Sequence, residues 1–376
     1  MRAPSHPLRR RASRARCAWL AGVCALLLGT TSNATPIQLA PEPEWADSLT
    51  ALLAKADHSY PGELGVYVKD LQSGAEYSYK AEEPWYLASM VKVPVAIAVM
   101  RAVERAELSL DQTVTLSTSD YVDGTGQTNQ HGPGERLSID WLMHQMLVYS
   151  DNTATDMLIG QLGLQAVNDV TKELVPDGFE PITTLAEVRR QVYGHYHPAA
   201  ANLVGRQFLT LKQQRTEAER RAALARLLKV APSELASIRY DDAYAQYYAS
   251  GLNSAPLTAY GHLLERLARG EALKPDSTAY VLGVMGKVAT GSKRLKAGLP
   301  DTVSLAHKTG TQRGRFCDAG IAQARDGDQS RTVIIAACTR GSLSLDRSEQ
   351  ALSHVGRAVG QSGLFSQPLR LGRVTP

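Results

Sequence analysis

Hydrophobic residues recur along much of this chain at the three- and four-residue spacing of an α-helix. One interval differs, because residues 86–103 are nearly all apolar, which predicts a helix buried on all sides. Two short strand-like runs, 65–71 and 76–80, flank the turn residues 72–75 and predict a β-hairpin. Four Gly and one Pro mark residues 123–135 as a loop. Further helices are predicted at 44–57, 137–147, 153–163, 254–268, 277–285 and 346–360.

The C-terminal third predicts a sheet. A strand–loop run starts near residue 308 and includes strands at 316–324 and 331–339, joined by the turn-rich residues 325–330. If this hairpin is symmetric, Cys317 and Cys338 lie opposite each other. An oxidising compartment then permits a disulfide, and two buried, reduced thiols are the alternative that the sequence leaves open.

Helices at both ends, a terminal antiparallel sheet and a helical middle together predict the fold class. We expect an α/β fold of the α+β kind, with one antiparallel sheet flanked by helices and an additional all-helical subdomain. The candidate site is expected where these two layers meet.

The first 34 residues have the organisation of a secretory signal peptide. Six arginines precede a short apolar run over 17–29, and small residues lead to a cleavage position after Ala34. The run is shorter than the roughly 20 apolar residues of a transmembrane helix, so no stable membrane anchor is expected. The residues before Cys24 fit a lipoprotein signal poorly. We therefore expect export to the periplasm or the exterior.

Cleavage changes the charge balance. Residues 35–376 retain 35 basic and 37 acidic residues, a net charge of −2. The positive charge of the whole chain therefore gives no reason to expect nucleic acid as a partner. We expect residues 35–376 to form a single domain with an inserted segment at about 192–251. In that insertion, the basic stretch 206–229 is expected to be a solvated surface helix, and the tyrosine-rich residues 241–248 are expected to pack against the body.

Three short motifs provide the candidate chemistry: Ser-Met-Val-Lys at 89–92, Ser-Asp-Asn at 150–152 and Lys-Thr-Gly-Thr at 308–311. Each alone has an ordinary structural explanation, such as helix capping or a strand end. Ser89 and Lys92 are three residues apart on a predicted helix, so their side chains share one face. A serine needs a base to become nucleophilic, and a lysine in apolar surroundings loses its proton more easily.

The ordered trio resembles the penicillin-recognising serine enzymes, which include class A β-lactamases and penicillin-binding proteins. The resemblance extends over about residues 44 to 364. It implies an acyl-enzyme on Ser89, with Lys92 as the base and Ser150 relaying a proton to the leaving nitrogen. The backbone N–H groups of Ser89 and Thr311 would form the oxyanion hole. The implied substrate-binding residues are Asn152, Lys308, Thr309 and Gly310.

The resemblance fails at the residue that activates water for deacylation. Class A β-lactamases use a glutamate after the second motif. Alignment on Thr183 and Leu185 places Arg189 at that position. Glu187 is two residues early and is the first candidate for a deacylation base. The other acidic candidates in the insertion are Glu217, Glu219, Glu234, Asp241 and Asp242.

The sequence thus predicts an exported serine hydrolase of the class A β-lactamase type, acting on a small-molecule β-lactam. A D,D-peptidase or penicillin-binding protein with slow deacylation, acting on D-alanyl peptides, is the first alternative. A non-catalytic sensor of muropeptides or β-lactams is the second. No cofactor is expected, and no metal either, because the pair His195 and His197 lacks a clear third ligand.

Overall fold

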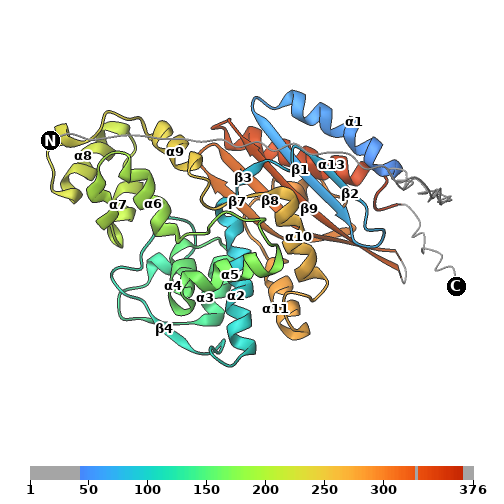
Figure 1. Cartoon of the computed structure of the whole chain (residues 1–376), viewed down its shortest axis with the longest axis horizontal. Helices are drawn as coiled ribbons and strands as arrows, with labels where there is room; N and C mark the ends of the chain where they lie inside the picture. The colour runs from blue at the N-terminus through green and yellow to red at the C-terminus, as the bar shows by residue number, and fades with distance from the viewer. Residues whose placement is uncertain (1–42, 327–328, 367–376) are drawn as a thin grey trace, which may run out of the picture. The chain divides into compact units, whose positions relative to one another are not determined.

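The computed structural model describes residues 43–326 and 329–366. Strands from both ends of the described chain form a five-stranded antiparallel sheet with the order β2-β1-β9-β8-β7. The predicted hairpin at the N-terminus therefore pairs with the last strand of the chain, and β7 is left at an edge (Figure 1). The strands are β1 (Glu63–Asp70), β2 (Glu76–Tyr79), β7 (Val303–Gln312), β8 (Arg315–Asp326) and β9 (Gln329–Arg340).

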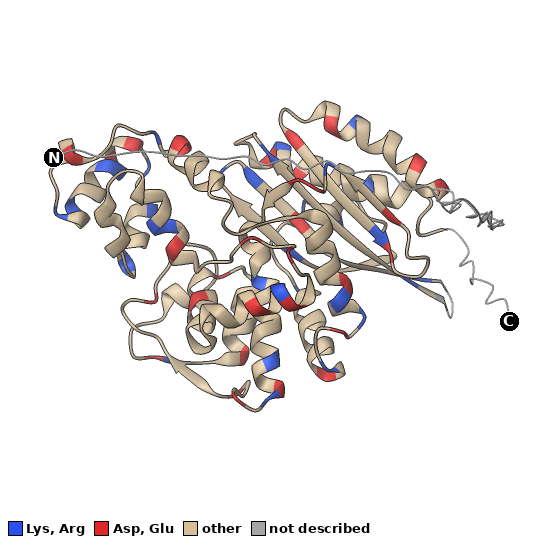
Figure 2. Ribbon diagram, in the orientation of Figure 1, with Lys and Arg blue, Asp and Glu red and all other residues tan. Residues whose placement is uncertain are grey.

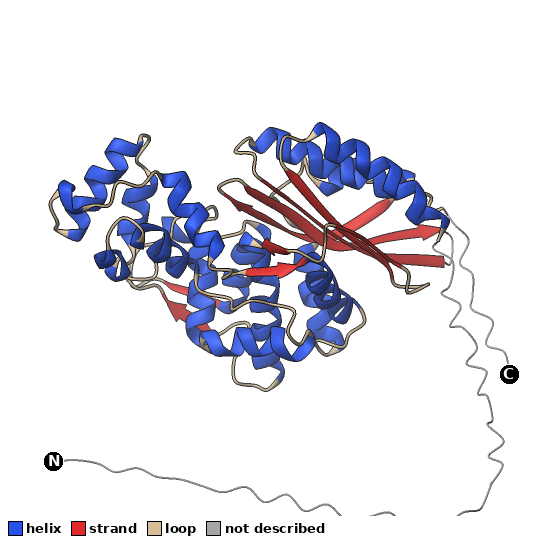
Figure 3. Cartoon of the chain, turned by 45° about the horizontal axis from the view of Figure 1, so that its top comes forward, coloured by secondary structure: helices blue, strands red, loops and turns tan. Residues whose placement is uncertain are grey.

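Helices cover both faces of this sheet (Figure 3). On one face lie α1 (Glu44–Ser59) and α13 (Leu345–Gln361), which bury Leu49, Leu53 and other apolar residues against the strands. On the other face lies α10 (Leu257–Ala268). Alternate residues of β1, β8 and β9 point to opposite faces, so each face supplies a separate hydrophobic cluster.

The helical subdomain surrounds α2 (Lys92–Glu104), in which ten of thirteen residues are buried. It supplies the all-helical part that the sequence predicted. Its other helices are α3 (Ile139–Val148), α4 (Asn152–Leu162), α5 (Leu164–Leu174) and α11 (Pro275–Met285). Two short ladders connect it to its surroundings: β3 (Pro84–Tyr86) with β6 (Ser254–Pro256), and β4 (Thr113–Thr115) with β5 (Arg136–Ser138). The short helix α12 (Leu295–Gly298) precedes β7.

The insertion and the helix that leads into it form four helices, which share a hydrophobic cluster with Tyr86, Ala88 and Val122 of the body. They are α6 (Leu185–Gly194), α7 (Arg206–Lys212), α8 (Glu217–Leu228) and α9 (Tyr240–Ala249). The prediction of one solvated helix over 206–229 is wrong, because Phe208, Leu211 and Leu224 are fully buried and the segment is two helices. Both basic and acidic residues occur in these helices (Figure 2). The tyrosine-rich helix α9 packs against the body, as expected.

Two predicted boundaries are wrong. Residue 86 ends the strand β3, and the helix expected from there begins only at Lys92, after the 3₁₀ turn Ala88–Val91. Likewise, residues 254–256 pair as β6 before α10 begins at Leu257. Before α2 the cause is that apolar residues preceding a buried helix look like part of it, because burial on all sides removes the helical period. The third motif was also expected to start a strand, but it lies near the end of β7.

The predicted C-terminal hairpin is symmetric about its turn. Cys317 of β8 pairs with Cys338 of β9, and the two form a disulfide with a Cα–Cα distance of 4.0 Å. Both residues are buried. The disulfide therefore replaces the two reduced thiols that the sequence had left as an alternative.

The predicted signal peptide, residues 1–34, lies outside the described residues. Within the part that is described, no helix combines the length and apolar character needed to cross a membrane.

Candidate active site

The nucleophile candidate Ser89 lies in the 3₁₀ turn that leads directly into α2. Lys92 is the first residue of α2, and its Nζ donates a hydrogen bond to Ser89 Oγ at 3.1 Å. Ser89 is half-buried, whereas Lys92 is completely buried. The residue before the nucleophile, Ala88, has a φ of 49°, a left-handed conformation that a non-glycine residue adopts rarely. The fold thus holds a reachable hydroxyl next to a desolvated amine.

The second motif brings two more groups to Lys92. The ammonium donates to the carbonyl oxygen of Ser150 at 2.7 Å and to Asn152 Oδ1 at 2.8 Å. Ser150 has a φ of 62°, which turns its hydroxyl back toward the lysine, 3.3 Å away. Asp151 is buried and caps α4, because its carboxylate accepts the backbone N–H groups of Ala154 and Thr128. Asp151 therefore supports the turn.

The third motif reaches the same hydroxyl from the sheet. Lys308 Nζ donates to Ser150 Oγ at 2.9 Å, so one serine joins the helical subdomain to the edge strand β7. The hydroxyl of Thr309 lies 2.6 Å from that of Thr290. Gly310 is packed so closely that an added Cβ would lie 2.4 Å from the carbonyl oxygen of Leu87. Only glycine therefore lets the strand approach the turn that carries Ser89.

Burial controls the charge of both lysines. It lowers the pKa of Lys92 to about 7, because the low-dielectric interior disfavours the ammonium ion. Burial also lowers the pKa of Lys308 well below its ordinary value, and the positive charges of Lys92 and Arg294 add to that effect. A neutral amine beside a serine hydroxyl can accept its proton, and a cation beside it can bind an anion.

Arg294, immediately before α12, belongs to this site, although the sequence analysis did not identify it. Its Nη1 donates to the carbonyl oxygens of Gly310 and Cys317, both at 2.9 Å, and its Nη2 donates to Thr311 Oγ1 at 2.7 Å. Glu349 of α13 is its ion-pair partner. This buried arginine fixes the end of β7. Nothing in the local sequence distinguishes it from a surface arginine, because all these partners are distant along the chain.

A model of the Beta-lactamase enzyme family matches residues 45–362 in one stretch. The chain belongs to that family. The match includes the helical insertion, and it covers all the motif residues that the structure brings together.

Named relatives show how far the likeness to this family extends. Beta-lactamase ROB-1 of Haemophilus influenzae is 33% identical over 135 residues, which cover 35% of this chain and 43% of that protein. The chain thus spans less than half the length of this β-lactamase. A beta-lactamase of Mycobacterium tuberculosis is 24% identical over 330 residues, covering 84% of this chain and 86% of the other.

A solved structure supports the fold. A PBP-A mutant in an acyl-enzyme complex with penicillin G aligns with a TM-score of 0.62 and 19% identity, over 86% of this chain and 98% of the other. At this identity the likeness establishes the fold alone. It agrees with the sheet and helical subdomain predicted from the sequence.

The position where the sequence analysis sought a deacylating glutamate holds Arg189. Arg189 of α6 is buried there and donates from Nε to Asp123 Oδ1 at 2.5 Å. Asp123 in turn accepts the amide of Asn152 at its backbone oxygen, at 2.6 Å. Among the described residues, Arg189 Nη1 is one of the few buried side-chain nitrogens without a hydrogen-bond partner. An arginine ion pair therefore occupies the place where a carboxylate was sought.

Glu187 is not brought to the nucleophile. Its carboxylate contacts Arg190 at 3.3 Å and Gln191 at 2.9 Å, both on α6. Two residues correspond to about 200° of helical rotation, so Glu187 and Arg189 face different directions. The other acidic candidates bind within or beside the insertion; for example, Glu217 accepts the hydroxyl of Tyr196 at 2.8 Å.

A buried carboxylate, Asp156 of α4, connects the insertion to the site. It accepts the backbone N–H groups of Leu185 and Ala186 at the start of α6, at 2.7 and 2.8 Å. Burial raises the pKa of Asp156 to about 6, although these hydrogen bonds favour its charged form. Its negative charge also favours the ammonium form of Lys92. The sequence analysis did not identify this residue.

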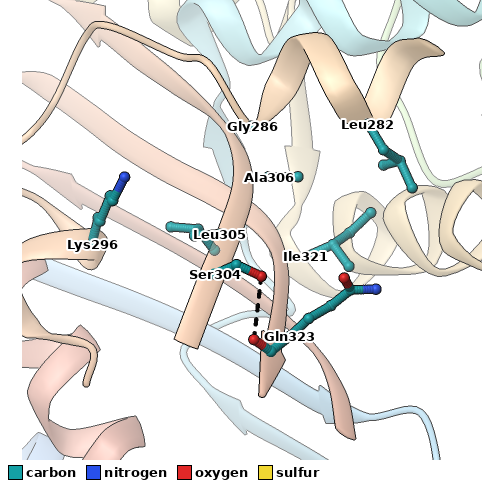
Figure 4. Close-up of a pocket in the computed structure, with 8 residues that line it drawn as sticks. All are labelled: Leu282, Gly286, Lys296, Ser304, Leu305, Ala306, Ile321 and Gln323. Carbon is teal, nitrogen blue, oxygen red and sulfur yellow. Dashed lines mark hydrogen bonds between the residues drawn. The ribbon is translucent and has the colours of Figure 1, made fainter. Parts of the chain in front are cut away.

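A separate cavity of about 270 Å³ lies along β7, nearer its N-terminal end than the third motif (Figure 4). Leu305 and Ala306 of β7, Leu282 of α11 and Ile321 of β8 supply its apolar side chains, and Lys296 and Gln323 lie at its margin. None of the three motifs lines it.

No cluster of at least three His, Cys, Asp or Glu residues suitable for a metal ion occurs in the described ranges. His197 instead accepts the N–H of Ala199 at a helix start.

Proposed function

We propose that this protein is a serine hydrolase that opens the β-lactam amide through an acyl-enzyme on Ser89. The observation that carries the proposal is the continuous set of short contacts from Ser89 Oγ to Lys92 Nζ, Ser150 Oγ and Lys308 Nζ. These contacts join three motifs that are up to 219 residues apart. Acyl transfer needs a nucleophile, a base, a proton relay and a cation, and here each of these groups contacts the next.

The reaction begins with a neutral Lys92. Its amine accepts the proton of Ser89 as the serine oxygen attacks the lactam carbonyl, and the negative charge on the carbonyl oxygen is stabilised by the N–H groups of Ser89 and Thr311. The carbon–nitrogen bond then breaks. The leaving nitrogen takes its proton from Ser150. Ser150 then recovers a proton from Lys92, which had accepted it from Ser89. The product of this half-reaction is an ester on Ser89.

The remaining motif residues hold the substrate. Lys308 and the hydroxyl of Thr309 bind its carboxylate, and that anion stabilises the charged form of Lys308. Asn152 binds the amide of the acyl side chain. Gly310 lets β7 approach the turn that carries Ser89, which brings the substrate-binding residues of β7 close to the serine.

A second candidate function is a penicillin-binding D,D-peptidase with slow deacylation. The Arg189–Asp123 ion pair favours it, because a guanidinium cannot act as a base for water. Benzylpenicillin would then remain on Ser89 for far longer than in a β-lactamase.

Glu187 is the sequence's candidate for the deacylation base, and its substitution separates the two functions. We expect Glu187→Gln to leave the lifetime of the acyl-enzyme unchanged, because this carboxylate is engaged by Arg190 and Gln191. The lifetime is measured by intact mass after excess benzylpenicillin is removed. Accumulation of the adduct in the variant alone would instead identify Glu187 as the base.

Export completes the proposal. The arginine-rich and apolar residues before Ala34 are the features that support a signal peptide. The mature protein is expected to begin at Thr35, which N-terminal mass analysis of the protein recovered from the periplasm or medium tests directly. Recovery of the chain with residues 1–34 intact would contradict it.

The central experiment mixes residues 35–376 with benzylpenicillin and follows intact mass and β-lactam absorbance together. We expect a one-to-one adduct on the wild type, and none on Ser89→Ala. Rapid loss of absorbance with little adduct indicates a β-lactamase, and a long-lived adduct indicates a penicillin-binding peptidase. Saturable binding without any adduct would support a non-catalytic sensor and contradict the proposal.

A further inference from the structure

The inserted helix α9 contacts both chain segments that carry the oxyanion-hole groups. We propose that α9 is a brace that sets the separation of the Ser89 and Thr311 N–H groups, with Tyr248 as a positioning residue. This inference rests on the proposed function, since it requires an acyl-enzyme on Ser89. Figure 1 shows α9 beside the end of β7, at the side of the sheet where the insertion joins the body.

The first contact is with the turn that follows Thr311. The hydroxyl of Tyr248 donates to the backbone oxygen of Arg313 at 2.9 Å, two residues beyond Thr311. The guanidinium of Arg315 lies over the Tyr248 ring, 4.4 Å from its centre. The ring is thus held on one side by a cation and at its tip by the backbone. A helix of the insertion therefore fixes the β7–β8 turn.

The second contact is with the segment that precedes Ser89. Tyr86 packs against Tyr247 and Tyr248 of α9, with ring centres 5.7 and 4.7 Å apart. Tyr247 also accepts a hydrogen bond from the side chain of Asn253 at 2.8 Å. The backbone oxygen of Asn253 accepts the N–H of Leu87 at 2.9 Å. Two independent contacts therefore connect α9 to the residues just before the nucleophile.

The two braced segments touch each other between these contacts. An added Cβ on Gly310 would meet the oxygen of Leu87 at 2.4 Å and the Cβ of Ala88 at 3.3 Å. β7 and the turn that carries Ser89 are thus in contact at Gly310. The contacts of α9, with Arg313 beyond this point and with Tyr86 before the turn, restrict how the two can rotate relative to each other. Displacement of an oxyanion-hole donor by a fraction of an ångström weakens its hydrogen bond to the developing negative charge.

The ion pair between Arg313 and Asp241 is a weaker part of the same interface. Both side chains are about one-third exposed, so solvent screens their attraction. Tyr248 is half-buried, and although its hydrogen bond to Arg313 is also exposed, it holds the backbone of the turn directly, and the ring is packed against Tyr86. We therefore expect the tyrosine, and not the ion pair, to determine the position of the turn.

Tyr248→Phe tests the brace, because it removes one hydroxyl and retains the ring. We expect kcat/KM for benzylpenicillin, which reports acylation whichever step limits turnover, to fall about five- to tenfold. The ester carbonyl stretch of the acyl-enzyme, followed by rapid-mixing infrared spectroscopy, should move to higher frequency as the oxyanion hole loosens. Tyr247→Phe, which removes the acceptor of Asn253, should act in the same direction.

Tyr196→Phe is the matched control. Its hydroxyl donates to Glu217 at 2.8 Å, and Glu217 also accepts the N–H of Tyr240 at the start of α9. The same atom is thus removed at the other end of α9, where the hydroxyl bonds to neither braced segment. We expect its kcat/KM and carbonyl frequency to equal those of the wild type. Unchanged carbonyl frequencies in both Tyr248→Phe and Tyr247→Phe, or an equal change in Tyr196→Phe, would overturn the brace. A wild type that forms no adduct would instead contradict the proposed function itself.

Discussion

Lys92 is the residue whose environment most directly determines the proposed chemistry. It is completely buried, and its three acceptors at Ser89, Ser150 and Asn152 are neutral. Neutral acceptors stabilise an ammonium ion less than a carboxylate would, so burial is the dominant influence and lowers the pKa to about 7. The amine is thereby available as a base near neutral pH.

This pKa predicts the acidic limb of the pH profile. Acylation requires the neutral amine, so kcat/KM should fall about tenfold per pH unit below about 7 and level off above it. The measurement is kcat/KM for benzylpenicillin over roughly pH 5 to 9. Lys92→Arg retains a fixed charge and should be inactive throughout this range. A profile that does not change through pH 7 would exclude Lys92 as the base.

Other residues of the site show where sequence reasoning ends. Ser89, Lys92, Asn152 and Lys308 could be predicted, because their motifs are short and the chemical requirement is local. Arg294 and the Asp123–Arg189 pair could not, since their partners are separated from them by tens of residues. Contacts of that kind depend on the packed fold, and no local pattern encodes them.

At the scale of elements, periodicity predicted most helices and the terminal hairpin. The amphipathic helix α13 matches its predicted range within one residue at each end, because it has one buried and one exposed face. The pattern failed where this contrast was absent. Residues before α2 are apolar whether in a strand or a helix, and the many charges over 206–229 concealed the buried Phe208 and Leu211.

The β8–β9 hairpin carries a prediction about its disulfide. Cys317 and Cys338 are separated by 21 residues, and closing such a loop in the unfolded chain stabilises the native state by about 3 kcal/mol. We expect the reduced protein to have a free energy of unfolding lower by about that amount, measured by urea titration with and without reductant. Cys317→Ala/Cys338→Ala should unfold identically in both conditions. If reductant leaves the wild-type curve unchanged, the bond contributes no stability.

At the scale of the whole molecule, the contacts between the insertion and the body determine whether the two unfold together. The insertion's hydrophobic cluster includes Tyr86, Ala88 and Val122, which belong to the body, next to the nucleophile. Asp156 and the Arg189–Asp123 pair add buried polar contacts across the same boundary. Breaking a buried ion pair of this kind leaves an uncompensated charge, which is strongly unfavourable. The insertion should therefore not separate from the body while the body remains folded.

Tryptophan reports on the body alone, whereas tyrosine reports on both parts, because six of the fifteen tyrosines lie in the insertion. Trp45, Trp85 and Trp141 all lie outside the insertion, whereas residues 192–251 contain six tyrosines and no tryptophan. We expect tryptophan fluorescence and tyrosine near-ultraviolet circular dichroism of residues 35–376 to give the same urea midpoint and slope. Coincident transitions indicate that the insertion and the body unfold as a single cooperative unit. Arg189→Met should lower both midpoints together. A tyrosine transition at lower urea than the tryptophan transition would show that the insertion is an independent folding unit, and such a unit could not hold the oxyanion hole in place.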